Sequence, residues 1–255
     1  MKGRVIAVAG KGGTGKTTIG ALLIRSALKS KVEPILAVDA DPNYCLGEAM
    51  GMDVGETVGL LREDFGKLGS DLPPGMSKAN YLEMQANKAV VEGDGVDLVT
   101  MGRQEGPGCY CFANDVLRSV VDNLQDNYPL VVVDNEAGLE HLSRRTTRHV
   151  DWMVMVSDPA PKGLRAIERV LGLIGELKLD VRKKSLVINR VPEKGLDPAL
   201  LERAEKMRLD APPLLVPADH EIEKKDIAGE SLLDIENCQS CGLVDELFSQ
   251  IMERT

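Results

Sequence analysis

One nine-residue segment constrains the fold of this chain more than any other feature. It reads GKGGTGKTT at residues 10–18 and directly follows the apolar run at residues 5–9. The glycine spacing lets backbone N–H groups wrap around an anion, because glycine tolerates close approach and positive φ. Lys16 can reach the β- and γ-phosphates of a nucleotide, and the Thr17 hydroxyl can ligate Mg²⁺. The residues predicted to contact a bound nucleotide here are Gly12, Gly13, Thr14, Gly15, Lys16, Thr17 and Thr18.

The pattern around this segment predicts an α/β fold. Apolar, β-branched runs alternate with helical patterns, as expected for strands that are buried on both faces. The fold class that follows is a three-layer, doubly wound, mostly parallel sheet of about seven or eight strands flanked by helices, with ligands at the carboxyl ends of the strands. Residues 62–96 have poor periodicity and are interpreted as mixed helix and loop. Strands are expected at residues 4–9, 34–39, 97–101, 130–134, 152–157, 185–189 and 213–217, and helices at 16–30, 114–125, 139–149, 162–177, 198–207 and 243–253.

Composition limits the class of protein. The length of 255 residues favours a single domain over residues 1–255, and the hydrophobic fraction of 43% is enough for a large core. The net charge of −9 disfavours a nucleic-acid partner. No apolar stretch reaches the roughly 18–20 residues that cross a bilayer, and the first strand starts too early for a signal peptide, so we expect a cytoplasmic protein with no membrane partner. Five cysteines, an odd number, argue against a disulfide framework in such a reducing compartment.

Acidic residues at two strand ends are candidates for organising Mg²⁺ and water. Asp39 and Asp41 lie one residue apart in the stretch Asp-Ala-Asp-Pro-Asn, at the sheet edge where the phosphates are expected. Asp134 ends the buried run Val-Val-Val-Asp, and such an aspartate usually holds Mg²⁺ through water. Gly138 would let a backbone N–H meet the γ-phosphate. A turn or helix-capping role remains open for Asp39 and Asp41, because it is common in Asp-Pro-Asn sequences.

Lys11, near the start of the loop, resembles the signature lysine of the deviant P-loop ATPases, the group of MinD, ParA, the arsenite-pump ATPase and the nitrogenase iron protein. The resemblance implies a homodimer that closes over two molecules of ATP or ADP, each with Mg²⁺, while Lys11 crosses into the partner's site. It also implies that Asp41 positions the hydrolytic water, with Asp39 in a supporting or Mg²⁺-water role. The predicted catalytic residues are therefore Lys11, Lys16 and Asp41. The alternative for Lys11 is a solvated loop lysine.

The same resemblance suggests where the adenine lies. In MinD-like proteins an asparagine after one strand and a Pro-x-Asp loop after the next frame the base. Here Asn189 and Arg190 follow one predicted strand, and Pro217 and Asp219 follow another. Asn189 would pair with the base edge, and Pro217 and Asp219 would line it. Each residue alone is weak evidence, because polar residues are ordinary at strand ends.

Cys109 and Cys111 form a second informative motif, Gly-Pro-Gly-Cys-Tyr-Cys. A disulfide across one residue would close a strained ring. Two thiolates can instead ligate one soft metal ion, such as Zn²⁺, Cu(I) or Ni²⁺, or an iron–sulfur cluster. They fill half of a tetrahedral site, and a two-fold axis would supply the other two ligands from a partner subunit. Two unpaired thiols in a packed loop remain the alternative.

Together with the stretch at 134–145, these motifs resemble the CooC-type ATPases, the nickel-insertion accessory proteins of carbon monoxide dehydrogenase. The maturation ATPase of acetyl-CoA synthase is similar as well. The resemblance covers essentially the whole chain and implies Ni²⁺ or Zn²⁺ on Cys109 and Cys111, shared across the dimer, with carbon monoxide dehydrogenase or acetyl-CoA synthase apoprotein as partner. Two alternatives stay open: an electron donor with an intersubunit iron–sulfur cluster, and a MinD- or ParA-like spatial organiser. The acidic residues of the predicted helix at 243–253 disfavour the lipid binding that MinD needs.

The other potential ligands carry less information. Cys45 is expected to be a small buried side chain. Cys238 and Cys241 form a C-x-x-C motif before the last helix, for which chelation, redox chemistry and a purely structural role all stay open. The histidines show no metal-ligand spacing and are expected at the surface or in a switch helix; they are His141, His149 and His220.

Overall fold

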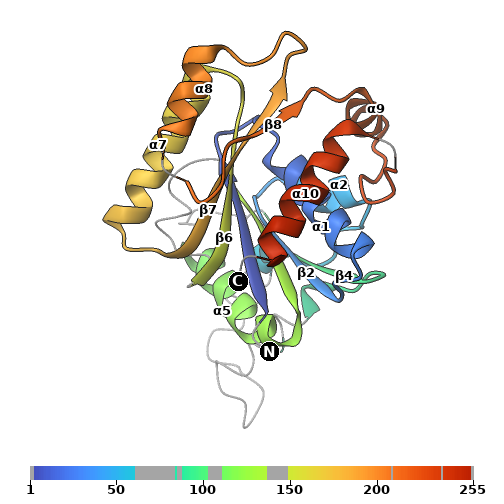
Figure 1. The fold of residues 1–255 in the computed structure, drawn as a ribbon. Helices are drawn as coiled ribbons and strands as arrows, with labels where there is room; N and C mark the ends of the chain where they lie inside the picture. Colours follow the sequence, from blue (N-terminus) through green and yellow to red (C-terminus); the bar gives the residue numbers. More distant parts are fainter. Residues whose placement is uncertain are drawn as a thin grey trace, which may run out of the picture.

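An eight-stranded sheet forms the centre of the computed structural model, which describes residues 3–60, 84, 88–102, 111–136, 149–207, 209–236 and 238–253. The strand order is β3-β4-β2-β5-β1-β6-β7-β8. All strand pairs are parallel except the β3–β4 pair at one edge. Helices pack on both faces of the sheet (Figure 1). The predicted doubly wound α/β fold is therefore confirmed.

The elements follow the predicted order. The strands are β1 (Arg4–Gly10), β2 (Ile35–Ala40), β3 (Val90–Val91), β4 (Val96–Thr100), β5 (Leu130–Asn135), β6 (His149–Ser157), β7 (Asp180–Val191) and β8 (Leu214–Pro217). The helices are α1 (Lys16–Lys29), α2 (Cys45–Met50), α5 (Cys111–Leu124), the 3₁₀ turn η1 (Gln125–Asn127), α7 (Pro161–Glu176), α8 (Pro198–Glu205), α9 (His220–Ala228) and α10 (Gln239–Glu253). All seven predicted strands are present.

The differences from the sequence-based prediction have simple causes. The elements α2 and β3 are too short to show periodicity, and α9 is mostly polar, with Ile222 and Ile227 as its large apolar residues. None of the three was predicted. The helix expected at 139–149 lies outside the described residues except for His149, where the prediction was wrong. His149 begins β6 and pairs in register with Asp180 of β7, and its two ring nitrogens lie 2.6 Å from Asp180 Oδ2 and 2.9 Å from Asp151 Oδ1. These polar contacts extend the strand into a segment that carries no apolar pattern.

The two faces of the sheet carry separate cores, because successive residues of a strand point to opposite sides. Ile6 and Val8 of β1 pack with α1 and α10, whereas Ala7 and Ala9 pack with α7. The apolar side chains of α10 that join the first core are Val244, Leu247, Phe248 and Ile251. The apolar face of the last helix is thus packed inside the molecule. Among the described residues, no helix is both long and apolar enough to cross a membrane.

A network of polar side chains fastens α10 to α1 beside this core. Arg25 is 6% exposed; its Nε donates to the Ile235 carbonyl at 2.6 Å, and its Nη1 lies 3.0 Å from Asp245 Oδ1. Ser26 Oγ donates to the same Asp245 oxygen at 2.6 Å, and Lys29 Nζ lies 2.7 Å from Oδ2. Burial raises the pKa of Asp245, but the hydrogen bonds from Lys29 and Ser26 and the charge of Arg25 outweigh it and hold the pKa below its ordinary value.

We expect Asp245→Asn to lower the free energy of unfolding by about 2 kcal/mol at neutral pH, because Arg25 is left buried without its counter-ion. The folded-state pKa of Asp245 is depressed. The contribution of Asp245 to the free energy of unfolding is therefore complete above its pKa in the unfolded chain, about 4, and is lost as the pH falls below that pKa. Urea unfolding at pH 7 and at acidic pH measures both effects. Glu246→Gln, an exposed carboxylate on the same helix, is the matched control, and equal losses in the two variants would contradict the role of the network.

Candidate functional site

The glycine-rich loop turns the chain from β1 into α1 at the carboxyl edge of the sheet. Gly13 and Gly15 have φ values of 79° and 89°, in the left-handed region that favours glycine. Thr14 closes the turn, since its Oγ1 donates to the Lys11 carbonyl at 2.8 Å. The helix begins at Lys16, directly after Gly15. The amino end of α1 and its unpaired N–H groups therefore meet the loop where an anion would be held.

The end of β7 braces this loop from the side. Asn189 Nδ2 donates to the Thr14 carbonyl at 3.0 Å, and Arg190 Nη1 donates to the Gly13 carbonyl at 3.2 Å. A Cβ added at Gly15 would lie 2.3 Å from Asn189 Nδ2, so the loop has no room for a side chain there. The contact expected between Asn189 and a base stays a prediction. The structure gives Asn189 a second role that the sequence did not reveal, in which its amide fixes the loop.

Asp134 lies beneath the start of α1, at the end of β5. Thr17 Oγ1 donates to Asp134 Oδ2 at 2.6 Å. The other oxygen, Oδ1, is buried and receives no hydrogen bond within the described part of the chain. Burial is the largest cause that raises the pKa of Asp134 to about 6, against the lowering effects of Thr17 and Lys16. A buried anionic oxygen next to a threonine hydroxyl fits a Mg²⁺ ion and its water ligands.

Asp39 is the register partner of Asp134 on the neighbouring strand β2. Both of its oxygens accept backbone hydrogen bonds, from Asp41 N at 3.0 Å and from Leu46 N at 2.8 Å. Burial and the nearby Asp134 raise the pKa of Asp39 to about 7. The capping alternative considered for Asp39 is thus present in the structure, because its carboxylate shapes the turn that leads into α2.

Asp41 takes part in the same turn. Its Oδ1 accepts from the Asn43 backbone N–H at 2.9 Å and from Asn43 Nδ2 at 2.8 Å. This is the turn geometry common in Asp-Pro-Asn sequences. Asp41 also lines the cavity above the glycine-rich loop, as does Cys45. The expectation that Cys45 is buried was wrong, because its side chain is only half-buried and faces this cavity.

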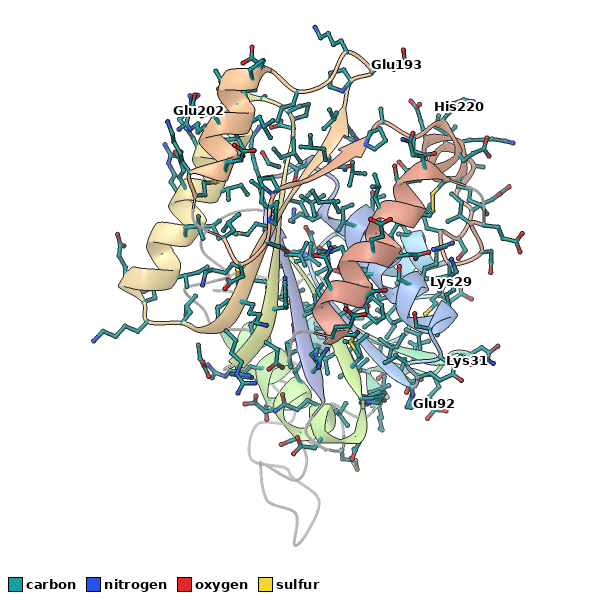
Figure 2. The ribbon with its side chains drawn as sticks, in the orientation of Figure 1. Lys29, Lys31, Glu92, Glu193, Glu202 and His220 are labelled. Carbon is teal, nitrogen blue, oxygen red and sulfur yellow. A yellow bond between two sulfur atoms is a disulfide. The ribbon has the colours of Figure 1, made fainter. Side chains whose placement is uncertain are left out.

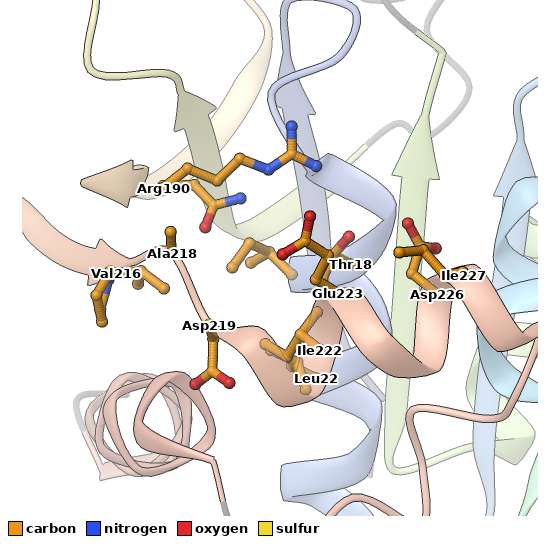
Figure 3. A pocket seen from close by; sticks show the side chains of 13 residues that line it. Thr18, Leu22, Arg190, Val216, Ala218, Asp219, Ile222, Glu223, Asp226 and Ile227 are labelled. Carbon is orange, nitrogen blue, oxygen red and sulfur yellow. The ribbon is translucent and has the colours of Figure 1, made fainter. Parts of the chain in front are cut away.

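Two adjoining cavities meet at the loop. The one above the glycines has a volume of about 540 Å³, and its neighbour has about 420 Å³. Thr18, Arg190 and Asp226 line both. The smaller cavity has apolar walls that suit a planar base; they include Ile19, Leu22, Val216, Pro217, Ile222 and Ile227 (Figure 3). Phosphates at the loop and a base in the second cavity are consistent with this shape.

The α9 helix forms one wall of the smaller cavity and was missed from the sequence. Asp219 caps it, with Oδ1 accepting from Glu221 N at 3.1 Å. Asp219 Oδ2 also accepts from Ser240 N at 3.0 Å, and the Pro217 carbonyl accepts from Ser240 Oγ at 3.3 Å. Pro217 and Asp219 thus line the cavity and also join α9 to the start of α10. Their expected contact with a base stays a prediction. The Asp-x-Glu spacing at 219–221 was the available signal for this helix.

Several predicted residues fall outside this description. Cys109 and Gly138 lie outside the described residues, and only the backbone of Cys111 is described, where it begins α5. Within the described ranges, no three metal-binding side chains gather into a cluster. Cys238 and Cys241 are joined in a disulfide. The expectation of no disulfide framework therefore needs a correction, although this bond links neighbours in one turn and holds no distant segments together.

Comparisons with known proteins agree with this geometry. The model of the CobQ/CobB/MinD/ParA nucleotide binding domain matches residues 5–232. An uncharacterized ATP-binding protein of Methanocaldococcus jannaschii is 41% identical over 98% of this chain and 99% of its own length. The carbon monoxide dehydrogenase accessory protein CooC of Rhodospirillum rubrum is 29% identical over 90% of this chain and 89% of its own. The cell division ATPase MinD of Pyrococcus furiosus shares the fold, with a TM-score of 0.71 at 21% identity over 99% and 100% of the two chains.

We expect Asp134→Asn to stabilise the nucleotide-free protein by about 2 kcal/mol at pH 8, because an amide avoids the buried charge. The folded pKa of Asp134 lies above its unfolded value. The free energy that the ionised Asp134 costs the wild type is therefore complete above about pH 6 and vanishes below about pH 4. The stability advantage of Asp134→Asn has the same pH dependence. Unfolding curves across this range test the sign, with the exposed Asp53→Asn as control. Mg²⁺ and ATP should stabilise the wild type and have little effect on Asp134→Asn.

Proposed function

The chain belongs to the CobQ/CobB/MinD/ParA family of nucleotide-binding ATPases, and from this premise we propose that it is a Mg²⁺-dependent, dimeric metallochaperone. In this proposal the dimer binds ATP, carries nickel or zinc on a shared cysteine site, and delivers the metal to carbon monoxide dehydrogenase or a related nickel enzyme. The observation that carries the ATPase part is the Thr17–Asp134 pair beneath the amino end of α1, whose buried Asp134 Oδ1 has no hydrogen-bond partner among the described residues.

We assign the phosphates to the backbone of the glycine-rich loop and to Lys16, which is 7% exposed at the first position of α1. Thr17 would ligate Mg²⁺ directly, and Asp134 would hold its water ligands, with Asp39 supporting both from the next strand. Asp41 would orient the attacking water from the cavity above the loop. Charge that develops on the transferred phosphoryl group then meets the positive helix end and a lysine.

Lys11 has a different position from Lys16, and this difference supports a separate role. Its side chain is exposed at the loop, whereas that of Lys16 is buried. An exposed cation at the mouth of the site can reach a nucleotide in a second copy that closes over it. A buried lysine on its own helix cannot. The proposed homodimer therefore has two lysines for each nucleotide, one from each subunit. On the base side, the proposed contacts are Asn189, Arg190, Pro217 and Asp219.

The metal cargo is proposed from the Cys109 and Cys111 motif and from the similarity to CooC. The chain leaves β4 at Thr100, and the Met101 N–H donates to the Asp39 carbonyl at 2.8 Å. The segment that leads to the two cysteines thus departs from the same sheet edge as the nucleotide site. We propose that closure of a dimer over nucleotide completes the ligand set of Cys109 and Cys111.

A second candidate function is the spatial organiser suggested by the similarity to MinD. Lipid docking by α10 is disfavoured, because the apolar face of this helix is buried against α1 in the core. The two functions differ in whether metal is required. Metal analysis combined with measurement of the molecular mass, with and without nucleotide, separates them directly.

We expect Lys11→Gln to keep nucleotide binding and to lose most hydrolysis, by two or more orders of magnitude as for other cations at developing phosphoryl charge. Lys16→Ala is the matched variant and should lose binding itself, since the phosphates lose the cation of their own subunit. Calorimetry of ATP binding and a steady-state phosphate assay distinguish the two. Mixing Lys11→Gln with Asp41→Asn should restore some activity in heterodimers. Full hydrolysis by Lys11→Gln would remove the proposed role of this lysine.

We expect Cys109→Ser or Cys111→Ser to abolish tight metal binding while ATP binding remains, because the two sites use different residues. The wild type should bind about one Ni²⁺ or Zn²⁺ per two chains, since each chain supplies two of four tetrahedral ligands. Metal should also promote dimers, and binding should strengthen as the pH rises because thiols must lose protons. A Cys238→Ser/Cys241→Ala variant is the control and should keep this stoichiometry. One metal per chain with no change in mass would contradict the shared site.

A further inference from the structure

We propose that the Cys238–Cys241 disulfide is a reversible redox switch that controls nucleotide affinity from the base side of the site. This inference rests on the proposed nucleotide site and is independent of the metal cargo. Figure 2 shows the bond at the end of α10 that lies near His220, the first residue of α9. Three observations support the proposal: the position of the two sulfurs, their unequal exposure, and the contacts of Ser240, which lies between the two cysteines in the sequence.

The pair sits at the amino end of a 15-residue helix. Cys238 directly precedes Gln239, the first residue of α10, and the Cys241 N–H donates to Cys238 Sγ at 3.0 Å. Cys238 therefore stands where a capping side chain would stand. Such a position favours the thiolate anion, because the helix dipole faces the sulfur and the Cys241 N–H donates to it.

The two sulfurs differ in accessibility. Cys241 is 2% exposed and belongs to the core between α1 and α10, whereas Cys238 is partly exposed. An incoming thiol can therefore attack only Cys238. Thiol–disulfide exchange requires such a reachable sulfur and a leaving thiolate that the protein accommodates. The asymmetry fits a pair that opens and closes more than it fits a fully buried structural cross-link.

The reaction balances with a dithiol as the reductant. One reductant thiolate attacks Cys238 Sγ, a mixed disulfide forms, and Cys241 leaves as a thiolate that takes up a proton. The second reductant thiol attacks the mixed disulfide, releases Cys238 as a thiolate, and closes a cyclic disulfide. Two electrons pass from the reductant to the protein. The reverse reaction requires a disulfide or another two-electron oxidant.

Ser240 connects this pair to the nucleotide cavity. It lies inside the ring that the disulfide closes and is completely buried. Its N–H donates to Asp219 Oδ2 at 3.0 Å, and its Oγ donates to the Pro217 carbonyl at 3.3 Å. Pro217 and Asp219 line the 420 Å³ cavity, and the other oxygen of Asp219 caps α9. The disulfide thus fixes the backbone of the residue that positions two walls of the base site.

Reduction changes this arrangement in two ways. Opening the ring gives the first turn of α10 additional backbone freedom, which weakens the geometry that Ser240 imposes on Pro217 and Asp219. It also creates a thiolate at Cys238 that competes with the Asp219 carboxylate for the N–H groups of the same helix end. Both effects loosen the Asp219 anchor and the start of α9. The oxidised protein should therefore bind nucleotide more tightly than the reduced protein.

The test compares the affinity of the full chain for Mg²⁺-ADP in the two redox forms by calorimetry. Oxidised glutathione and dithiothreitol set the forms, and the mass after maleimide labelling must show a difference of two thiols. We expect about fivefold weaker binding after reduction, the lower end of typical coupling between sites. By reciprocity, ADP should lower the reduction potential of the pair by about 20 mV, the same fivefold effect for two electrons.

Two variants assign the effect to this pair. Cys238→Ser/Cys241→Ala should bind ADP more weakly than the oxidised wild type, because the ring is open, and should not respond to dithiothreitol, even though the other cysteines remain. Ser240→Ala should bind more weakly when oxidised and show a smaller response to reduction, because its contact with Pro217 is gone.

The outcomes that overturn the inference are distinct. A pair that stays oxidised in the folded protein under excess dithiothreitol is a structural cross-link, and equal affinities in forms that differ by two thiols exclude the coupling. A response that persists in Cys238→Ser/Cys241→Ala assigns the effect to another cysteine. No ADP binding in either form would contradict the nucleotide site itself.

Discussion

The site is organised around one buried carboxylate, that of Asp134, whose two oxygens have unequal surroundings. One accepts from Thr17, and the other has no hydrogen-bond partner within the described part of the protein. A buried anion in this position costs free energy unless a cation or a proton balances it. The strand order places this carboxylate between the glycine-rich loop on β1 and the turn after β2. The buried charge of Asp134 therefore lowers the stability of the protein at the centre of its sheet, and the Mg²⁺ ion that we propose for this site would offset that cost.

The loop above this carboxylate is held by the fold and does not depend on a ligand for its shape. Asn189 and Arg190 donate to two consecutive loop carbonyls, and the lack of a side chain at Gly15 permits the approach of Asn189. A loop that is ordered before binding loses little further entropy when the phosphates arrive. The same two residues border the base-side cavity. Asn189 and Arg190, near the end of β7, therefore both support the loop and line the smaller cavity, where we propose that the base binds.

How much the sequence predicts depends on how local each interaction is. The glycine-rich loop, the buried parallel strands and the acid at the end of β5 follow from short patterns, and the structure confirms the fold that they predict. The bond from Asn189 to Thr14 joins residues 175 positions apart, and no local pattern indicates it. The turn at Asp41 and the caps made by Asp39 and Asp219 use residue types that suit several roles, so spacing alone leaves those roles open.

His149 and Cys45 were misjudged for a related reason. His149 extends β6 through contacts with Asp151 and Asp180, and a polar strand end has no apolar alternation to reveal it. Cys45 follows a turn whose direction is set by the Asp39 caps, so its exposure depends on three-dimensional geometry and not on its hydrophobicity.

The packing of α10 on α1 has a consequence for the time at which the protein becomes competent during synthesis. The two helices share one core, yet about 210 residues separate the end of α1 from the start of α10. At typical translation rates, roughly 10 to 40 s pass between the synthesis of α1 and the synthesis of α10, which covers its apolar face. The glycine-rich loop leaves the ribosome early. The α10 helix, which packs against the α1 helix that follows this loop, is synthesised much later. Nascent chains therefore pass through a long interval with an uncovered hydrophobic surface, in which chaperones or premature self-association compete with folding.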